Sequence, residues 1–386
     1  MLEAHSHPAR WTTGFASSLP RAQRLATRGL APRTAWILWA AILVLGSAFT
    51  AVIPLILPAR FFYDSAHIAK IAQDGLAAGQ GDRSFIAVGE LYNILRLQDS
   101  PQLVAVVSFL ALAGAHTSVL FITVRERVAS ATTMALLTVS LALTAVYLTT
   151  YSKDAVVLMV TGAVLLSIGH RAGDLLIVGT TVLYALCFRD YWFIVALAYV
   201  AIRFADRYVR RPLLLLAPLA LVVVIALGYS VMTGGSITSI RDLANALRTN
   251  SPDAHTLIPR YLNLVEPWNG MLNSALTVLL LVLPVPLVLL GGVYYVAIAL
   301  LLFVLWASVA FGWLRRPAGR AGVIASRALA LILAFLTAQA MFEPDYGSAL
   351  RHLAPLLPVL VLGVAMSFSG AAAAGTRIRR RGRHSA

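Results

Sequence analysis

Long apolar runs separated by short polar segments make up most of this 386-residue chain. A bilayer core about 30 Å thick is crossed by about 20 helical residues, and lipid-exposed backbone must satisfy its hydrogen bonds within its own segment. We therefore expect each run to form a transmembrane helix. The runs occupy residues 35–57, 102–124, 128–149, 155–169, 174–188, 191–205, 213–232, 271–290, 291–313, 321–342 and 352–369.

Lys and Arg in the short loops orient these helices, because cytoplasmic loops are enriched in both residues. With the basic N-terminal tail inside, the long segments 58–101 and 233–270 are external loops. Apolar positions repeat with helical spacing in both loops, which predicts amphipathic helices at the outer surface, including a short helix over 236–248.

The alternation of inside and outside loops fails at one place. Two complete crossings within 271–313 would put the next basic loop and the basic C-terminal tail outside. An odd number of crossings restores the pattern. Residues that break helices interrupt this block, so a discontinuous or re-entrant element is predicted there. They are Pro284, Pro286, Gly291 and Gly292.

The predicted fold class is an all-α, polytopic transmembrane helical bundle of about 10–12 spans, with two long external loops that carry amphipathic helices. Residues 1–33 form a basic cytoplasmic tail, residues 34–369 the membrane-embedded domain and residues 370–386 a second basic cytoplasmic tail. The expected location is the cytoplasmic membrane, with both termini cytoplasmic.

Composition supports this assignment and limits the partners. The chain is 59% hydrophobic and 12% charged, with a mean hydropathy of +0.81, whereas an average protein is about 25% charged. The net charge of +15 lies largely in the two tails, where it favours anionic membrane lipids. No basic face on a soluble domain is predicted, which argues against nucleic acid as a partner. The single cysteine, Cys187, excludes an intramolecular disulfide.

Most of the 16 acidic residues fall on the outer side in this topology. Five of them lie near helix ends, where burying a charge is costly and function is often the reason. These are Asp64, Asp154, Asp190, Glu343 and Asp345. A simpler interpretation is local neutralisation, because Arg60, Lys153 and Arg189 stand close to three of them in sequence.

Carboxylates, histidine and arginines on one face suit sugar transfer from a lipid diphosphate. A carboxylate or histidine removes a proton from an acceptor hydroxyl, and arginines bind a diphosphate leaving group bidentately. Asp64 is the leading candidate for the catalytic group, with Glu343, Asp345 and His352 as alternatives. The candidates for binding substrate or diphosphate are Arg60, Lys153, Asp154, Arg189, Asp190, Arg241, Arg248, Arg260 and Arg351. No metal and no cofactor is predicted, and His116, in the middle of a span, is expected to be a hydrogen-bonded core residue.

Four stretches carry a resemblance to a known family. They are "RFFYDSAHI" after the first span, "YSKDAV", "FRDYW", and "FEPDYGSALRHLAPLLP" before the last span. With them the chain resembles Wzy-type and EpsG-like bacterial polysaccharide polymerases, which are GT-C-like integral-membrane glycosyltransferases. The resemblance implies an enzyme of capsule or exopolysaccharide biosynthesis in the bacterial inner membrane. It would join glycan units carried on undecaprenyl diphosphate at the outer face, alongside other polysaccharide-assembly proteins.

Two other classes remain open at this stage. A transporter or flippase of lipid-linked or small substrates would have broken helices and ionisable residues near the middle of the membrane. A non-catalytic scaffold of the membrane would tolerate neutral substitutions of the charged outer rim.

Overall fold

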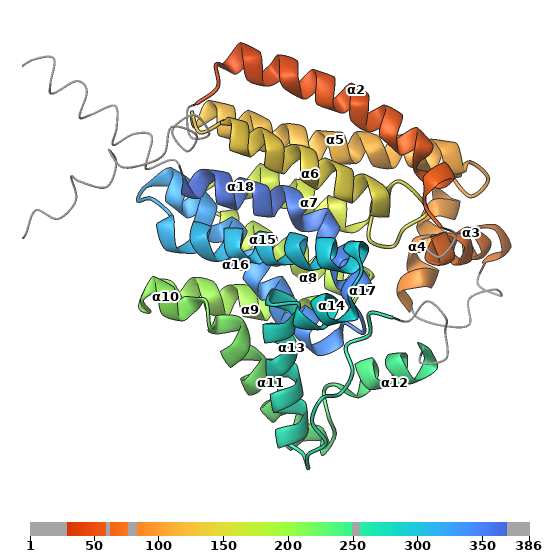
Figure 1. Ribbon diagram of the computed structural model, residues 1–386, viewed down its shortest axis with the longest axis vertical. Coiled ribbons are helices and arrows are strands. Elements are labelled where there is room, and N and C mark those ends of the chain that lie inside the picture. The colour runs from red at the N-terminus through yellow and green to blue at the C-terminus, as the bar shows by residue number, and fades with distance from the viewer. Residues whose placement is uncertain (1–28, 59–61, 76–82, 249–254, 369–386) are drawn as a thin grey trace, which may run out of the picture.

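The computed structural model describes residues 29–58, 62–75, 83–248 and 255–368, and these segments form a bundle of helices (Figure 1). The only β-type pairings within these segments are the isolated bridges Gly29–Ser130 and Leu257–Asp345. The predicted all-α architecture is therefore confirmed.

Six of the described helices are long and apolar enough to cross a membrane. They are α2 (Pro32–Ile56), α5 (Pro101–Arg125), α6 (Ala131–Leu148), α15 (Val293–Arg315), α16 (Arg320–Phe342), and the stretch Tyr346–Ser367 that comprises α17 (Tyr346–Leu353), η3 (Ala354–Leu356) and α18 (Leu357–Ser367). Shorter apolar helices are α7 (Val157–Ser167), α8 (Gly173–Cys187), α9 (Trp192–Ala205), α11 (Ala217–Thr233) and α13 (Trp268–Val282).

The centre of the bundle is α16, which packs against α9 and α18 and also contacts α11 and α13. Nearly all of α16 and of the stretch Tyr346–Ser367 is buried, as expected for helices that are apolar on every side. Glycine allows α18 to approach α16 closely. A Cβ added to Gly363 of α18 would lie only 2.8 Å from Leu329 Cδ2 of α16.

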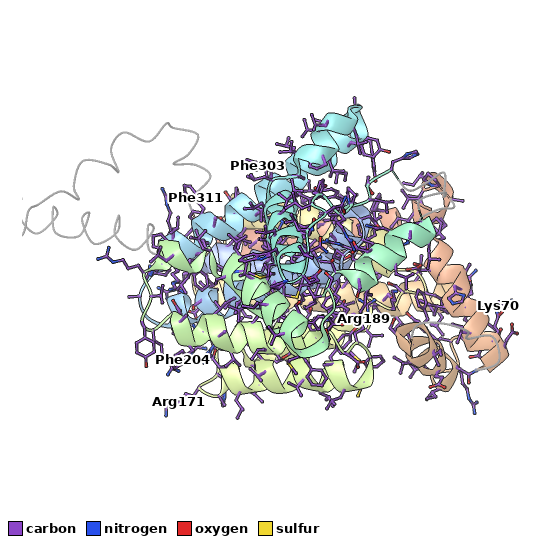
Figure 2. The ribbon with its side chains drawn as sticks, turned by 90° about the horizontal axis from the view of Figure 1, so that it is seen from below. Lys70, Arg171, Arg189, Phe204, Phe303 and Phe311 are labelled. Atoms are coloured by element: carbon purple, nitrogen blue, oxygen red, sulfur yellow. The ribbon has the colours of Figure 1, made fainter. Side chains whose placement is uncertain are left out.

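The flanks of the bundle present large apolar side chains outward. Phe204, Phe303 and Phe311 are 61%, 47% and 50% exposed, and they extend from the sides of the helices in Figure 2. The outermost helix, α2, contacts only α5 and α6 closely and is mostly exposed although it is strongly apolar. An apolar perimeter around a packed interior suits lipid as the surrounding solvent.

The polar loops gather at two opposite ends of the bundle, marked by Lys70 and Arg171 in Figure 2. We call one the Asp64 end. It carries α3 (Tyr63–Asp74) and α4 (Arg83–Ile94), which pack on each other and confirm the helices predicted in 58–101. The hydroxyl of Tyr151, in the α6–α7 loop, donates to Leu97 O at 2.6 Å and joins that loop to the same end.

We call the opposite end the Glu126 end. Arg320 Nε, at the start of α16, pairs with Glu126 Oε1 at 3.1 Å after α5. The loop before α8 also lies there, because Arg327 Nη1 donates to Ile168 O and His170 O at 2.8 and 2.7 Å. The short helix α10 (Arg211–Leu214) begins at this end as well, since Arg211 Nη1 donates to Arg316 O at 2.7 Å. The basic loops that the sequence placed on one side of the membrane thus share one end of the molecule.

The block 271–313 breaks where the sequence predicts. After α13 comes the six-residue α14 (Val285–Leu290), and Gly291 and Gly292 then adopt φ values of 71° and 78°, which glycine accepts without steric cost. The end of α13 stays at the Asp64 end, because the Tyr346 hydroxyl donates to Leu280 O at 3.2 Å. Only α15 then crosses, and its Trp313 Nε1 donates to Arg211 O at the Glu126 end. This one crossing satisfies the charge rule.

The loop 233–270 contains the predicted short helix, α12 (Ser239–Arg248). Its exposed face carries Ile240, Leu243 and Leu247, while Arg241 on its other side is fully buried against the bundle. Arg241 Nη1 donates to Ala340 O in the last turns of α16 at 3.2 Å. This contact fixes α12 at the Asp64 end.

Candidate functional site

Segments distant in sequence bring charged side chains together at the Asp64 end. They are the first turn of α3, the α6–α7 loop, the α8–α9 connection, the residue after α16, and the last turn of α17. We call this group the Asp154 cluster. Its members are Asp64, Lys153, Asp154, Arg189, Glu343, Arg351 and His352.

Asp154 lies at the centre, with a side chain only 1% exposed. Its Oδ1 is 2.9 Å from Arg189 Nη2, and its Oδ2 is 3.3 Å from Arg351 Nε. Burial alone would raise the pKa of Asp154, but the charges of His352, Arg189, Arg351 and Lys153 outweigh it and hold the pKa well below its usual range. Asp154 is therefore a fixed negative charge that positions cations around it.

Asp64 and Arg351 form the more open edge of the cluster. Arg351 Nη1 is 2.8 Å from Asp64 Oδ2, and the two side chains are 24% and 30% exposed. The guanidinium of Arg351 therefore joins the buried Asp154 to the accessible Asp64. A ligand that approaches from this edge meets a carboxylate and an arginine first.

Lys153 lies beside this edge, over the ring of Phe85 on α4, with Nζ 3.8 Å from the ring centroid. Burial and the nearby Arg189 charge outweigh the carboxylates of Asp64 and Asp154 and lower the pKa of Lys153 to about 8. The ammonium is thus easily neutralised for a lysine, whose ordinary pKa is 10.5.

His352 is held by Glu343 in the arrangement typical of a general base. Its Nδ1 is 2.5 Å from Glu343 Oε1, and Glu343 is buried. Burial raises the pKa of Glu343, but the charge of the nearby His352 and its hydrogen bond lower that pKa by more than burial raises it. The pKa is therefore below its usual value, and the carboxylate is ionised. Donation from Nδ1 to this carboxylate leaves Nε2 to accept a proton. The imidazolium so formed is flanked by Glu343 and by Asp154, whose Oδ1 is 3.6 Å from Nε2.

The cluster is not saturated with hydrogen bonds. Several of its buried polar atoms form ion-pair contacts at most and make no hydrogen bond to the described part of the chain. They are Asp154 Oδ1, Arg189 Nη2, Glu343 Oε2, Arg351 Nε and His352 Nε2. Because buried polar groups in native proteins are nearly always hydrogen-bonded, so many incomplete groups at one place indicate a site that binds water or a ligand.

The remaining predicted site residues lie elsewhere. Arg60 is outside the described residues, and Asp190 is exposed next to Arg189. Around α12, Arg248 pairs with Asp345 at 2.8 Å and Arg260 with Asp242 at 2.5 Å. These residues are at the same end of the bundle but are not part of the Asp154 cluster, because each arginine is engaged by a nearer carboxylate.

Asp345 and Arg241 have structural contacts of their own. Asp345 Oδ1 accepts a hydrogen bond from Ser348 N at 2.7 Å and caps α17. Both carboxylate oxygens of Asp345 are therefore occupied, one by the helix cap and the other by Arg248. His352, in contrast, has a ring nitrogen without a hydrogen bond in the described chain. The fully buried Arg241 donates through Nη1 to Thr277 Oγ1 at 2.7 Å, while its Nε and Nη2 form no hydrogen bond within the described chain.

Neutralisation by sequence neighbours holds in part, because the adjacent Lys153 helps to lower the pKa of Asp154, but two ion pairs of the cluster join distant parts of the chain. Arg189 pairs with Asp154, and Asp64 pairs with Arg351 from the other end of the chain. These pairs form because the fold brings the start of α3, the α6–α7 loop, the α8–α9 connection and the last turn of α17 to one place. Asp154, predicted only as a binding residue, is the hub of the cluster.

A second charged group, at the Glu126 end, escaped the sequence prediction. We call it the Asp174 cluster, and it consists of Asp174, Tyr199, Arg203, Asp206, Arg316, Ser326 and Arg327. Arg327 is buried in α16 and donates to Asp174 Oδ2 through Nε and Nη2 at 3.0 and 2.8 Å. An arginine within an apolar span is the signal that could have revealed this group.

Two further predictions concern histidine and metal. His116 is fully buried and bonded on both ring nitrogens, to Leu112 O and Ser140 Oγ, each at 2.8 Å, which confirms a core role. Among the residues that the structure describes, no group of three or more His, Cys, Asp or Glu side chains is placed to hold a metal ion.

Fold and site together define a class, a helical multi-pass membrane protein with a buried, incompletely hydrogen-bonded charged centre at one end. No protein-family model, no curated protein and no solved structure matches the chain.

Proposed function

We propose that this chain is an integral-membrane glycosyltransferase, a polysaccharide polymerase that joins glycan units from polyprenyl-diphosphate-linked donors. The reaction would take place at the outer face of the cytoplasmic membrane. The observation that carries the proposal is the Asp154 cluster, in which a carboxylate-held histidine lies beside two arginines and a lysine. These are the groups needed for proton removal and for binding a diphosphate.

In the proposed reaction, the acceptor hydroxyl loses its proton to His352 Nε2 as its oxygen bonds to the anomeric carbon of the donor sugar. The bond from that carbon to the diphosphate breaks, and the lipid diphosphate leaves with the electron pair. Arg189, Arg351 and Lys153 stabilise the charge that develops on the leaving group. Glu343 keeps the imidazole in the tautomer that accepts a proton. Asp64, the base that the sequence favours, is ion-paired, so we assign the base to His352 and the positioning of Arg351 to Asp64.

The test is transfer by purified protein in lipid vesicles, with an undecaprenyl-diphosphate-linked oligosaccharide as substrate and product length read on gels. Loss of the general base in His352→Asn is expected to lower the transfer rate about 10²–10⁴-fold. Arg351→Ala should reduce polymer formation as well. Glu90→Gln, an exposed change on α4, is the matched control and should transfer normally. Full-length polymer from both site variants would remove the proposed function.

The break between α13 and α14 favours one alternative function. Transporters and flippases bind substrates where helices are discontinuous, and α13 ends at Val282 just before Pro284. Movement of a labelled lipid-linked oligosaccharide across vesicles, without formation of a new glycosidic bond, would support this second candidate.

A further inference from the structure

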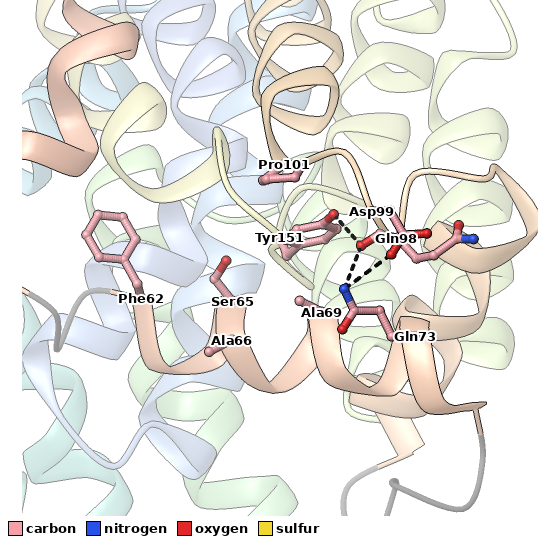
Figure 3. Close-up of a pocket in the computed structure, with 9 residues that line it drawn as sticks. All are labelled: Phe62, Ser65, Ala66, Ala69, Gln73, Gln98, Asp99, Pro101 and Tyr151. Atoms are coloured by element: carbon pink, nitrogen blue, oxygen red, sulfur yellow. Dashed lines mark hydrogen bonds between the residues drawn. The ribbon is translucent and has the colours of Figure 1, made fainter.

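A groove of about 400 Å³ opens at the Asp64 end of the bundle (Figure 3). It lies between α3, the segment that enters α5, and Tyr151 of the α6–α7 loop. Two of these elements also supply the cluster, because Asp64 precedes the groove residue Ser65 on α3 and Lys153 follows Tyr151 closely in the loop. The groove and the cluster therefore share two structural elements at the same end of the bundle.

The groove has an apolar and a polar part. Figure 3 shows Phe62 at one end of the α3 segment and Gln73 at the other, with Ala66 and Ala69 between them. These alanines leave room above the helix for a ligand. Asp99 lies opposite Gln73. A pocket of this size, with a small number of placed polar groups, suits a small molecule or one unit of a chain.

The polar part offers mainly hydrogen-bond acceptors. The one hydrogen of the Tyr151 hydroxyl is shared between Leu97 O at 2.6 Å and Gln98 O at 2.9 Å, so its oxygen is left as an acceptor. Gln73 Nε2 lies 3.3 Å from Gln98 O and 3.4 Å from Asp99 Oδ1, contacts at the long limit of hydrogen bonding. Both side chains are exposed, so a ligand can replace this weak contact with shorter ones.

The charge and polarity of the lining select among ligands. The Asp99 carboxylate repels a phosphate, so the groove is a poor site for the diphosphate that the arginines of the Asp154 cluster suit. Its amide, carboxylate and hydroxyl groups are also costly to cover with an isoprenoid chain, which cannot hydrogen-bond them. A neutral molecule rich in hydroxyl donors, with an apolar C–H face for Phe62 and the alanines, satisfies both parts.

We infer that this groove is a carbohydrate-binding subsite, which holds a neutral sugar unit of the acceptor glycan at the same end of the bundle as the Asp154 cluster. Its role in catalysis depends on the proposed glycosyl transfer, whereas its sugar binding does not. Asp99 and Gln73 bind the sugar hydroxyls, and Phe62 packs against the ring.

The test measures binding of methyl glycosides of common hexoses to the full-length protein in lipid nanodiscs, by saturation-transfer NMR and titration. Inorganic pyrophosphate is the anionic control probe. Removing the charged acceptor in Asp99→Asn, or blocking the groove in Ala66→Leu, is expected to weaken glycoside binding about tenfold or more. Asp74→Asn makes the same chemical change on α3 outside the groove and should bind like the unaltered protein. All variants change exposed residues.

His352→Asn separates this inference from the proposed function. It should lower the transfer rate about 10²–10⁴-fold and leave glycoside binding unchanged. If the unaltered protein transfers no sugar but binds glycosides, and Asp99→Asn and Ala66→Leu weaken that binding, the inferred subsite stands and the proposed function is removed. The inference is overturned if no glycoside binds, if pyrophosphate competes for the groove, or if Asp99→Asn and Ala66→Leu bind as tightly as Asp74→Asn, even where transfer persists.

Discussion

The two ends of the bundle use the same residue types in different ways. In the Asp174 cluster the carboxylates are fully bonded: Asp174 Oδ1 accepts from Tyr199 and Arg203 at 2.7 and 2.8 Å, and its Oδ2 accepts from Arg327. Asp206 is bonded by Ser326 at 2.7 Å and also by Arg316. None of the atoms in this cluster is among the buried groups without a hydrogen bond in the described chain.

In the Asp154 cluster the charges are close but the hydrogen bonds are incomplete. Arg189 Nη2 and Asp154 Oδ1 are 2.9 Å apart, yet neither atom forms a hydrogen bond with good geometry inside the described chain. A saturated network fixes helices in one arrangement, whereas an unsaturated one keeps donors and acceptors for a ligand. Hydrogen-bond saturation, rather than the number of charges, separates the end that stabilises from the end that we propose to be catalytic.

Exchanging the central carboxylate at each end should produce the largest contrast. Asp154→Asn removes the charge that positions Arg189, Arg351 and His352, so we expect the transfer rate to fall about 10²–10³-fold. Asp174→Asn should lower the melting temperature while folded protein keeps its transfer rate. Both are measured on purified protein in lipid vesicles, as initial rates and thermal melts. Equal losses of rate in the two variants would remove the distinction between the ends.

Loss of Arg327 should have the next largest effect, on stability. Arg327→Met removes the main donor to Asp174 Oδ2 and the donor to three loop carbonyls, those of Ile168, His170 and Arg171, and breaking a buried pair costs about 3–5 kcal/mol. We take the lower part of that range because the Asp174 side chain is 39% exposed. The melting temperature in detergent measures the change. Arg171→Met, an exposed substitution at the same end, is the control and should stay within about 0.5 kcal/mol.

The smallest expected effect is that of pH on Lys153. Raising the pH should weaken pyrophosphate binding and increase the stability of the fold. Its pKa of about 8 means that raising the pH from 7 to 9 removes a positive charge from the site, so pyrophosphate affinity should fall severalfold. The unfolded chain keeps that proton up to its ordinary pKa of 10.5, so this residue's contribution to stability rises between pH 8 and 10.5. Titration calorimetry across this range measures the affinity.

Lys153→Met is the comparison for the pH series. It should bind pyrophosphate more weakly at pH 7 and show only the pH dependence of the probe itself. Its melting temperature should equal or exceed that of the unaltered protein, because a buried ammonium is no longer required. An unchanged pH dependence in Lys153→Met would assign the titration to another group.

Local pattern and charge predicted the architecture well because both report on the membrane. Apolar runs predicted the helices, the charge rule predicted an odd number of crossings in 271–313, and the prolines and glycines of that block predicted its break. Helix ends also marked Asp64, Asp154 and Arg351 as candidates. Their proximity is a property of the fold, since they lie far apart along the chain.

The contacts of these candidates were beyond sequence reasoning. The pairing of Asp64 with Arg351 depends on how the first external loop lies against the last helices, which no local pattern specifies. Asp345 and Arg248 looked equivalent to residues of the site, but capping and pairing engage them elsewhere. Arg327 was overlooked because the mean hydropathy of its span is high enough to predict a transmembrane helix despite one charged residue.

The cap of α17 has a consequence for how far this protein can change. Asp345 fixes where the helix starts, and Arg351 and His352 follow about 9 Å further along its axis. Each inserted or deleted residue in that interval would rotate both side chains by about 100° away from Asp154. Loop lengths can drift in related chains, but those that keep this chemistry must preserve the six-residue step from the aspartate to the arginine.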